Sequence, residues 1–107
     1  MRYSVELTPQ AVGQIQDIVS YISKELLVPD TAKAWADHLK SEMSNLDSLP
    51  ERYPVVDMEP WRSRGYHVMR VKNYLVYYYI DNDRNIVWVT AVIYGRREQL
   101  NALKEGL

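Results

Sequence analysis

The sequence predicts an α+β domain in which a hairpin of two helices lies against one face of a twisted antiparallel sheet. Two segments in the first half have apolar residues at spacings of three and four, which is the period of an amphipathic helix. Three segments in the second half are rich in valine, isoleucine and tyrosine and are separated by polar turns, which is typical of an antiparallel meander. A fourth, short strand is expected before the helices.

The N-terminal strand and the first helix are separated by a helix-start signal. Residues 3–7, YSVEL, alternate in polarity as a half-buried strand does. Thr8 supplies an N-cap hydroxyl, and Pro9 suits the first helical turn. The apolar stripe that follows continues through about residue 27, and Pro29 is expected to end this helix.

The second helix is expected to begin at Asp30 or Thr31 and to end before Pro50. Its apolar residues again form one stripe, so the two helices are expected to pair as an antiparallel hairpin. Residues 50–64 contain three prolines and no periodic pattern, which indicates a loop.

Three strands are expected after this loop. The first is GYHVMRV at residues 65–71, and a tight turn at Lys72–Asn73 leads into NYLVYYYI at residues 73–80. The polar stretch DNDRN at residues 81–85 forms a hairpin loop before IVWVTAVIY at residues 86–94. The segment that follows the strands fits a short helix or a frayed tail.

Both faces of the two central strands carry large apolar side chains, and the helical hairpin can cover only one of them. The other face either forms an apolar, tyrosine-rich groove for a partner or is covered by the N-terminal strand, the loop at 50–64 and the C-terminal tail. Regular alternation assigns to this second face Leu75, Tyr77, Tyr79, Val87, Val89, Ala91 and Ile93.

Length and composition exclude several classes of protein. A chain of 107 residues with 47% apolar residues predicts a single domain spanning residues 1–107. The absence of cysteine excludes disulfides and thiolate zinc sites. Without a long apolar run or the apolar core of a signal peptide, we expect a cytoplasmic protein with no membrane partner. No cofactor and no metal are expected.

Charge is distributed unevenly along the chain, although the net charge is only −1. Residues 1–60 contain five Lys/Arg and ten Asp/Glu, whereas residues 61–107 contain eight and four. The acidic half can be a solvated helical surface. The basic half is a candidate surface for nucleic acid or for an acidic protein.

Two motifs in the second half are distinctive: VKNYLVYYYID at residues 71–81 and VTAVIYGRRE at residues 89–98. With the β–α–α–β–β–β order of elements, they resemble the RelE/ParE superfamily, the toxins of bacterial type II toxin–antitoxin modules. The resemblance covers essentially the whole chain and implies the superfamily fold: N-terminal strand, helical hairpin and three-stranded meander in one twisted sheet. It also implies a cognate antitoxin that neutralises the toxin by direct binding.

The superfamily contains two mechanisms. RelE-like members cut mRNA in the ribosomal A site, whereas ParE-like members poison DNA gyrase. RNA cleavage needs a base for the 2′-hydroxyl, stabilisation of the phosphate and an acid for the 5′-oxygen, and RelE-like enzymes use arginine, lysine and tyrosine for these roles. Arg97 and Arg70 match basic positions of that pattern, but Leu75 replaces another arginine and no tyrosine follows Arg97.

The motifs NYL and YGRRE are closer to the ParE branch. The resemblance therefore implies a growth-arresting toxin that inhibits DNA gyrase. The first alternative is a ribosome-dependent mRNA endonuclease acting with the ribosome and mRNA, and the second is an inactive binding module of the same fold. If the protein is a nuclease, its candidate catalytic residues are Arg97, Arg70, His67 and Tyr94.

Gly95 lets the backbone turn after the last strand, so that Arg96 and Arg97 stand at the open end of the sheet. There they can meet phosphate, an acidic target or carboxylates of the antitoxin, or they can simply be solvated. His67 can be a general acid/base or a structural histidine. The candidate residues for binding the target or the antitoxin are Arg62, Arg64, Lys72, Leu75, Tyr77, Tyr79, Arg96 and Arg97.

Overall fold

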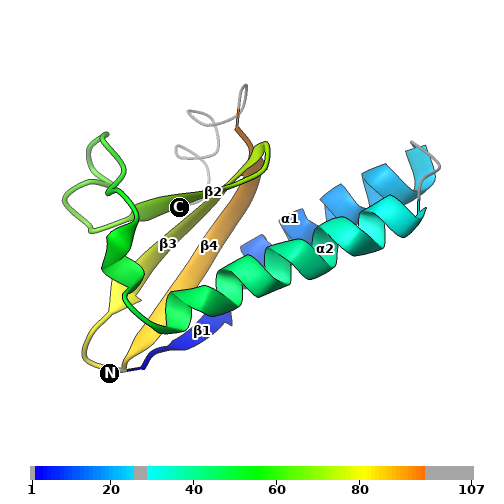
Figure 1. Ribbon diagram of the computed structural model, residues 1–107. Coiled ribbons are helices and arrows are strands. Elements are labelled where there is room, and N and C mark those ends of the chain that lie inside the picture. The colour runs from blue at the N-terminus through cyan, green and yellow to red at the C-terminus, as the bar shows by residue number, and fades with distance from the viewer. Residues whose placement is uncertain (1, 26–28, 96–107) are drawn as a thin grey trace.

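The computed structural model describes residues 2–25 and 29–95, and it has two α-helices on one face of a sheet (Figure 1). The regular elements are β1 (Ser4–Leu7), α1 (Pro9–Ser20), α2 (Pro29–Ser44), β2 (His67–Val71), β3 (Tyr74–Asp81) and β4 (Ile86–Tyr94). A π-helical turn at Tyr21–Glu25 follows α1, and short 3-10 turns occupy Asn45–Asp47 and Pro50–Arg52. The predicted α+β class and order of elements are confirmed.

The four strands form one sheet in the order β1-β4-β3-β2. Pairing of β2 with β3 and of β3 with β4 is antiparallel, as the meander predicts. However, β1 pairs with β4 in parallel, from Ser4 opposite Ile86 to Leu7 opposite Val89, so the sheet is mixed rather than purely antiparallel. The sequence could not reveal this direction, because the alternation within a strand is the same for either kind of neighbour.

The ends of the helices differ in detail from the prediction. The Thr8 hydroxyl accepts a hydrogen bond from the backbone N–H three residues further on at 3.3 Å, which confirms the predicted N-cap. The α-helical geometry was expected to continue to about residue 27, but it ends at Ser20 and gives way to the π-helical turn. Pro29 was expected only to end the first helix, but it is the first residue of α2, which therefore begins one residue before Asp30. Proline suits this position because the N–H of a first helical residue has no acceptor within the helix.

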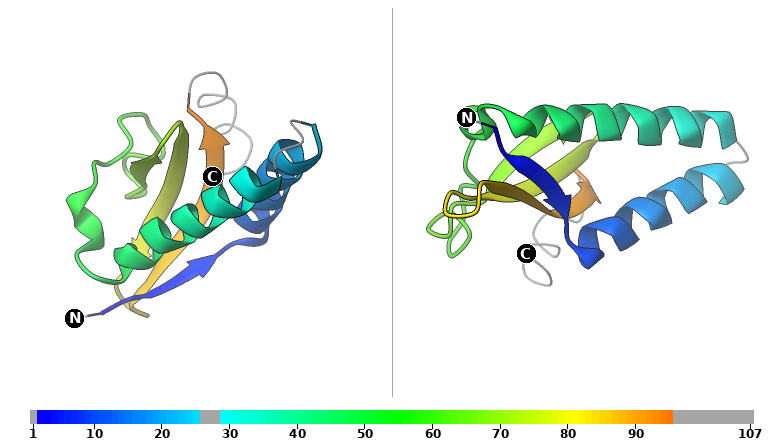
Figure 2. Two further views of the ribbon diagram at one scale, coloured as in Figure 1. Left: turned by 45° about the vertical axis from the view of Figure 1, so that its right-hand side comes forward. Right: turned by 90° about the horizontal axis from the view of Figure 1, so that it is seen from below.

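The helical hairpin packs across one face of the sheet and projects beyond its end, as the views in Figures 1 and 2 show. The apolar stripe of α2 is buried against this face and that of α1 is mostly half-buried, so the main core lies between helices and sheet. Its buried members are Ala11, Ile22, Ala32, Trp35, Leu39, Met43 and Leu46 from the helical half and Met69, Val71, Val76, Tyr78, Val87, Val89 and Val92 from the sheet.

The opposite face of the sheet is covered by the segment 56–66. It comprises most of the predicted loop at 50–64 and also residues 65–66, which were predicted to begin the next strand but precede β2. Val56 and Tyr66 are buried there, with Met58 and Trp61 packed beside them. The N–H of Val56 donates to the carbonyl of Tyr66 at 2.8 Å, which closes the segment over the strands. Of the two alternatives for this face, cover by the loop is the one found in the described part of the chain.

A β-bulge in β4 changes which of its side chains face the helices. Tyr77 pairs with Ala91 but Tyr78 pairs with Val89, so Thr90 is an extra residue. Regular alternation placed Val87 and Val89 on the face away from the helices, and this prediction is wrong for both: they are buried in the main core. The extra residue shifts the alternation by one, which the apolar sequence on either side does not disclose.

Candidate functional site

The chain leaves the sheet at Gly95 through a position that admits no larger residue without adjustment. The N–H of Gly95 donates to the carbonyl of Asn73 at 2.9 Å. A Cβ at Gly95 would lie 3.3 Å from that carbonyl oxygen, 3.3 Å from the Leu75 side chain and 3.7 Å from Nη1 of Arg70. The glycine therefore brings the end of β4 directly against the Arg70 side chain.

A pocket of about 410 Å³ lies beside this exit and is lined by Tyr53, Pro54, Val68, Arg70 and Leu75. We call it the Arg70 pocket. Arg70 is exposed and stands on β2 opposite Leu75 of β3, on the face of the sheet away from the helices. An exposed guanidinium among largely apolar lining residues suits an anionic group or an anionic side chain on a protein surface.

Buried hydrogen bonds hold the loop wall of this pocket in place. The Nδ1 atom of His67 is 2.8 Å from the carbonyl oxygen of Tyr53. The N–H of Val68 donates to the carbonyl of Pro54 at 3.0 Å, and the hydroxyl of Tyr78 donates to the carbonyl of Pro50 at 2.6 Å. These contacts tie the pocket wall to β2 and β3, so the shape of the pocket depends on the strands beneath it.

His67 acts in the structure as part of this anchor. It is only 8% exposed, and its ring stacks on Tyr78 with centroids 5.3 Å apart and an interplanar angle of 13°. Burial raises the pKa of the Tyr78 hydroxyl well above its usual value, so it remains a donor to the loop carbonyl. A stacked, buried imidazole bonded to backbone matches the structural alternative considered for His67.

Of the four candidate nuclease residues, the three that the structure describes do not share one face of the sheet. His67 is three residues from Arg70 on β2, so the two side chains point to opposite faces of the sheet. Tyr94 is on the helix-covered face, where its ring meets that of Tyr74 edge-on at 5.7 Å. Arg97 lies outside the described residues. Among the described residues, the Arg70 pocket is lined by no carboxylate and no imidazole.

The predicted basic residues that the structure describes lie before, within and after β2. Arg62 and Arg64 are exposed in the loop before β2, where Arg62 pairs with Asp57 at 3.4 Å. Lys72 is exposed in the turn after β2, in the left-handed conformation with φ 55°. Among the described basic residues of this set, Lys72 is therefore the nearest to Arg70 in the sequence, two positions further on. Arg96, like Arg97, falls outside the described residues.

The predicted apolar contact residues are covered in this structure. Leu75 is 6% exposed and Tyr77 is fully buried, both within the cluster beneath segment 56–66. Tyr79 is half-buried and its ring lies 5.3 Å from that of Tyr66. Leu75 contributes to the lining of the Arg70 pocket, whereas Tyr77 offers no surface for a partner to contact.

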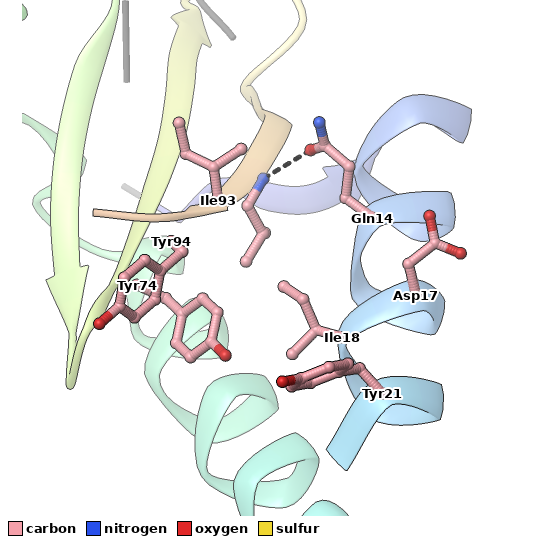
Figure 3. Close-up of a pocket in the computed structure, with 8 residues that line it drawn as sticks. Gln14, Asp17, Ile18, Tyr21, Tyr74, Ile93 and Tyr94 are labelled. Carbon is pink, nitrogen blue, oxygen red and sulfur yellow. Dashed lines mark hydrogen bonds between the residues drawn. The ribbon is translucent and has the colours of Figure 1, made fainter. Parts of the chain in front are cut away.

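Sequence reasoning missed a second hollow on the opposite face, which we call the α1–β4 groove (Figure 3). Its volume is about 510 Å³. It is lined by Gln14, Asp17, Ile18, Tyr21, Tyr74, Val92, Ile93 and Tyr94. The available signal was the spacing of polar and aromatic residues along α1, which did not reveal the strand that this helix face would meet.

Hydrogen bonds from α1 take the place of a neighbouring strand along this part of β4. Pairing with β1 ends at Val89. Gln10 then donates to the carbonyl of Thr90 at 3.1 Å, and Gln14 accepts from the N–H of Val92 at 2.8 Å. Two backbone groups of the edge are thereby satisfied by glutamine side chains.

Three tyrosines converge on the groove from three different elements. Tyr74 comes from β3, Tyr94 from β4 and Tyr21 from the π-helical turn, and the hydroxyl of Tyr21 points toward the sheet tyrosines in Figure 3. Burial raises the pKa of the Tyr74 hydroxyl, and the nearby Tyr94 and Tyr21 raise it further. The groove is therefore lined mainly by aromatic and aliphatic side chains, with Gln14 and Asp17 as its polar members.

Within the described ranges, no group of three or more histidine or acidic side chains is arranged to hold a metal ion. No helix among the described residues is long and apolar enough to cross a membrane.

Comparison with known proteins gives one family match. The model of the family described as ParE toxin of type II toxin–antitoxin system, parDE, matches residues 5–99. No curated protein sequence matches the chain.

Several solved structures share the fold. The chromosomal ParDE toxin–antitoxin system from P. aeruginosa aligns with a TM-score of 0.73 at 9% identity, over 87% of this chain and 96% of that one. The toxin–antitoxin complex RelBE2 from Mycobacterium tuberculosis aligns with a TM-score of 0.61 at 20% identity, over 88% and 99%. A double mutant of E. coli toxin RelE in the free state also has a TM-score of 0.61, at 12% identity over 95% and 93%.

Proposed function

The chain belongs to the family of ParE toxins of type II toxin–antitoxin systems, and we propose that it arrests growth by inhibiting DNA gyrase until a cognate antitoxin binds and neutralises it. The observation that carries this proposal is the match to the ParE family along residues 5–99, which includes every strand and helix except the first residue of β1. Because gyrase acts in the cytoplasm, we place the action of the protein there.

The arrangement of the candidate catalytic residues supports inhibition by binding rather than by catalysis. A nuclease needs a base and an acid on either side of the reacting phosphate. Here His67 and Tyr94 lie on the face of the sheet opposite to Arg70, and His67 is engaged with the loop backbone. Binding an acidic surface needs only an exposed cation, which Arg70 supplies.

We assign contact with the target to the end of the sheet around the Arg70 pocket. Arg70 and Lys72 are exposed there, and Arg96 and Arg97 follow Gly95 directly in the sequence. A concentration of cations favours an acidic partner and speeds its association. Arg62 and Arg64, which lie before β2, would extend the same positive potential along the strand.

Brief induction of the protein in cells tests this function. We expect the DNA-damage response and filamentation to begin while bulk protein synthesis continues. Arg70→Ala should weaken both effects, whereas Arg84→Ala is the matched control, because Arg84 is exposed in the distant β3–β4 turn. Arrest of translation before any DNA-damage response would contradict gyrase as the target.

A ribosome-dependent mRNA endonuclease is the second candidate, and the Arg70 pocket is the observation that favours it. The exposed Arg70 guanidinium that lines this pocket can hold a phosphate of an RNA backbone. Cuts within codons of ribosome-bound mRNA would support this candidate. An inactive binding module would produce neither effect while still binding the antitoxin.

A further inference from the structure

Leu49 lies in a backbone conformation that leucine rarely adopts. It stands between the 3-10 turns at Asn45–Asp47 and Pro50–Arg52, with φ 47° and ψ 51° in the left-handed region. A Cβ atom makes this conformation costly, so glycine or asparagine usually occupies such a position. Among the large apolar residues that are exposed in the described chain, Leu49 has the largest exposed fraction, 71%. Packing within the protein therefore does not explain a leucine at this position.

Anchors on both sides hold the turn at Leu49 in place. Before it, the carbonyl of Asp47 accepts a hydrogen bond from the N–H of Tyr3 at 2.8 Å. After it, Pro50 is buried, and its carbonyl accepts from the hydroxyl of Tyr78 at 2.6 Å. A strained conformation persists only where the surrounding structure determines it in this way, and such positions cluster at functional sites.

Arg52 braces the same turn from the solvent side. Its Nη1 atom donates to the carbonyls of Ser48 at 2.7 Å and Leu49 at 3.4 Å. Its Nη2 atom donates to the carbonyl of Asn45 at 3.3 Å, and its guanidinium carbon lies 4.9 Å from the centroid of the Tyr53 ring. These contacts use the planar fork of arginine, which can bond several carbonyls and stack on a ring together.

We propose that Leu49 is an apolar anchor in the surface that contacts the target, and that Arg52 is the positioning residue that holds it there. This inference rests on the proposed function, which places the target at the Arg70 pocket. The two places are continuous, because Tyr53 lines that pocket and also carries the Arg52 guanidinium on its ring. Val55, two residues after Tyr53, adds a second exposed apolar side chain to this surface.

This arrangement defines the chemistry of the partner surface. Leu49 needs an apolar depression to enter, and the exposed cations Arg52 and Arg70 need carboxylates around it. Because the turn is held in place before the partner arrives, less conformational entropy is lost on binding. A phosphate backbone offers no apolar depression, so the turn suits a protein surface rather than nucleic acid.

Inhibition of supercoiling by purified gyrase tests the role of Leu49. Leu49→Asn suits the left-handed backbone but removes the apolar side chain, so it should retain the stability of the parent in urea unfolding. It should nevertheless weaken inhibition by about ten-fold, as expected for the loss of a contact residue. Leu49→Met keeps an apolar side chain and should restore inhibition. Val12→Asn, at an exposed valine of α1, is the matched control and should inhibit as the parent does.

Arg52→Lys separates the positioning role from charge. Lysine keeps the positive charge but cannot hold the three carbonyls and the ring together, so inhibition of gyrase should weaken. Combining Arg52→Lys with Leu49→Asn should cause little further loss, because the arginine acts through the leucine. Arg84→Lys, in the exposed β3–β4 turn, is the matched control. Fully additive losses in the double variant would overturn the positioning role.

The behaviour of the parent separates this inference from the proposed function. Parental inhibition by folded Leu49→Asn, where the parent inhibits gyrase, would overturn the anchor and leave the proposed function intact. Cleavage of ribosome-bound mRNA by Leu49→Asn at the parental rate would identify nucleic acid as the partner and would also overturn it. If the folded parent does not inhibit gyrase, the proposed function fails, and the inference fails with it.

Discussion

The two faces of the sheet are covered by different kinds of structure. Two helices cover one face, and their apolar stripes meet a continuous layer of buried side chains that includes Leu39, Leu46 and Tyr78. The segment 56–66 covers the other face, where the buried cluster is smaller and includes Leu75. The segment leaves the end of that face open at the Arg70 pocket.

This difference indicates how stability and function are divided in a small protein. Regular helices bury a large area, so the buried core of the helix-covered face stabilises the fold, although this face also opens at the α1–β4 groove. An irregular cover leaves gaps, and here a gap holds the exposed cation that we assign to the target. Substitutions in the buried core of the first face should therefore change stability, and those at the open end of the second face should change toxicity.

The largest expected effect comes from a cavity in the main core. Leu46→Ala removes a side chain that is fully buried against the helix-covered face, and it should lower the free energy of unfolding by about 2–5 kcal/mol. Leu75→Ala, on the other face, should fall near the lower limit of this range because it borders the Arg70 pocket. Urea unfolding measures both. Leu49→Ala is the control, because Leu49 is 71% exposed. Equal losses for Leu46→Ala and Leu75→Ala would remove the distinction between the faces.

An intermediate effect is expected where the sheet anchors the loop. Tyr78→Phe leaves the carbonyl of Pro50 without its donor and should cost about 1–3 kcal/mol. Tyr94→Phe is the matched control, because that residue is exposed and should be close to neutral. Thermal or urea unfolding provides the comparison. A neutral Tyr78→Phe would mean that the loop wall is held by other contacts.

Alkaline pH should destabilise the protein through the same residue. Burial raises the pKa of Tyr78 above the ordinary tyrosine value of 10.0, so the unfolded chain loses this proton at a lower pH than the folded one. The stabilising contribution is complete below pH 10.0 and declines as the pH rises above it. Tyr78→Phe should therefore lose less stability than the parent as the pH rises from about 10 to 12. Identical slopes for the two proteins would contradict this assignment.

The smallest effect on stability should accompany a large effect on toxicity. Arg70 is exposed, so Arg70→Ala should change the free energy of unfolding by no more than about 0.5 kcal/mol while reducing growth arrest. Arg84→Ala should change neither. A large drop in the melting temperature of Arg70→Ala would identify the arginine as structural instead.

Much of the fold could be predicted because it depends on local patterns. The last strand was predicted at residues 86–94 and is found at Ile86–Tyr94, and the Thr8 cap was predicted from a single hydroxyl before a proline. The bulge at Thr90 could not be predicted, because both faces of β4 are apolar and an extra residue does not change the visible pattern of polarity. The parallel pairing of β1 likewise depends on where the hairpin returns the chain, not on β1 itself.

The candidate site was harder to predict, since it depends on how distant segments meet. Arg70 was identified, but its pocket depends on Tyr53 and Pro54, which lie in a region without a periodic pattern. The burial of Tyr77 depends on the same loop. The α1–β4 groove was missed because the sequence does not show which strand packs against this face of α1.

Inhibition of gyrase is the central claim, and supercoiling by purified gyrase in the presence of the purified protein tests it most directly. We expect the parent protein and Arg84→Ala to inhibit supercoiling or to trap cleaved DNA complexes, and Arg70→Ala to do so at substantially higher concentration. Normal supercoiling at every concentration of the folded parent, together with cleavage of ribosome-bound mRNA by the same preparation, would contradict the account.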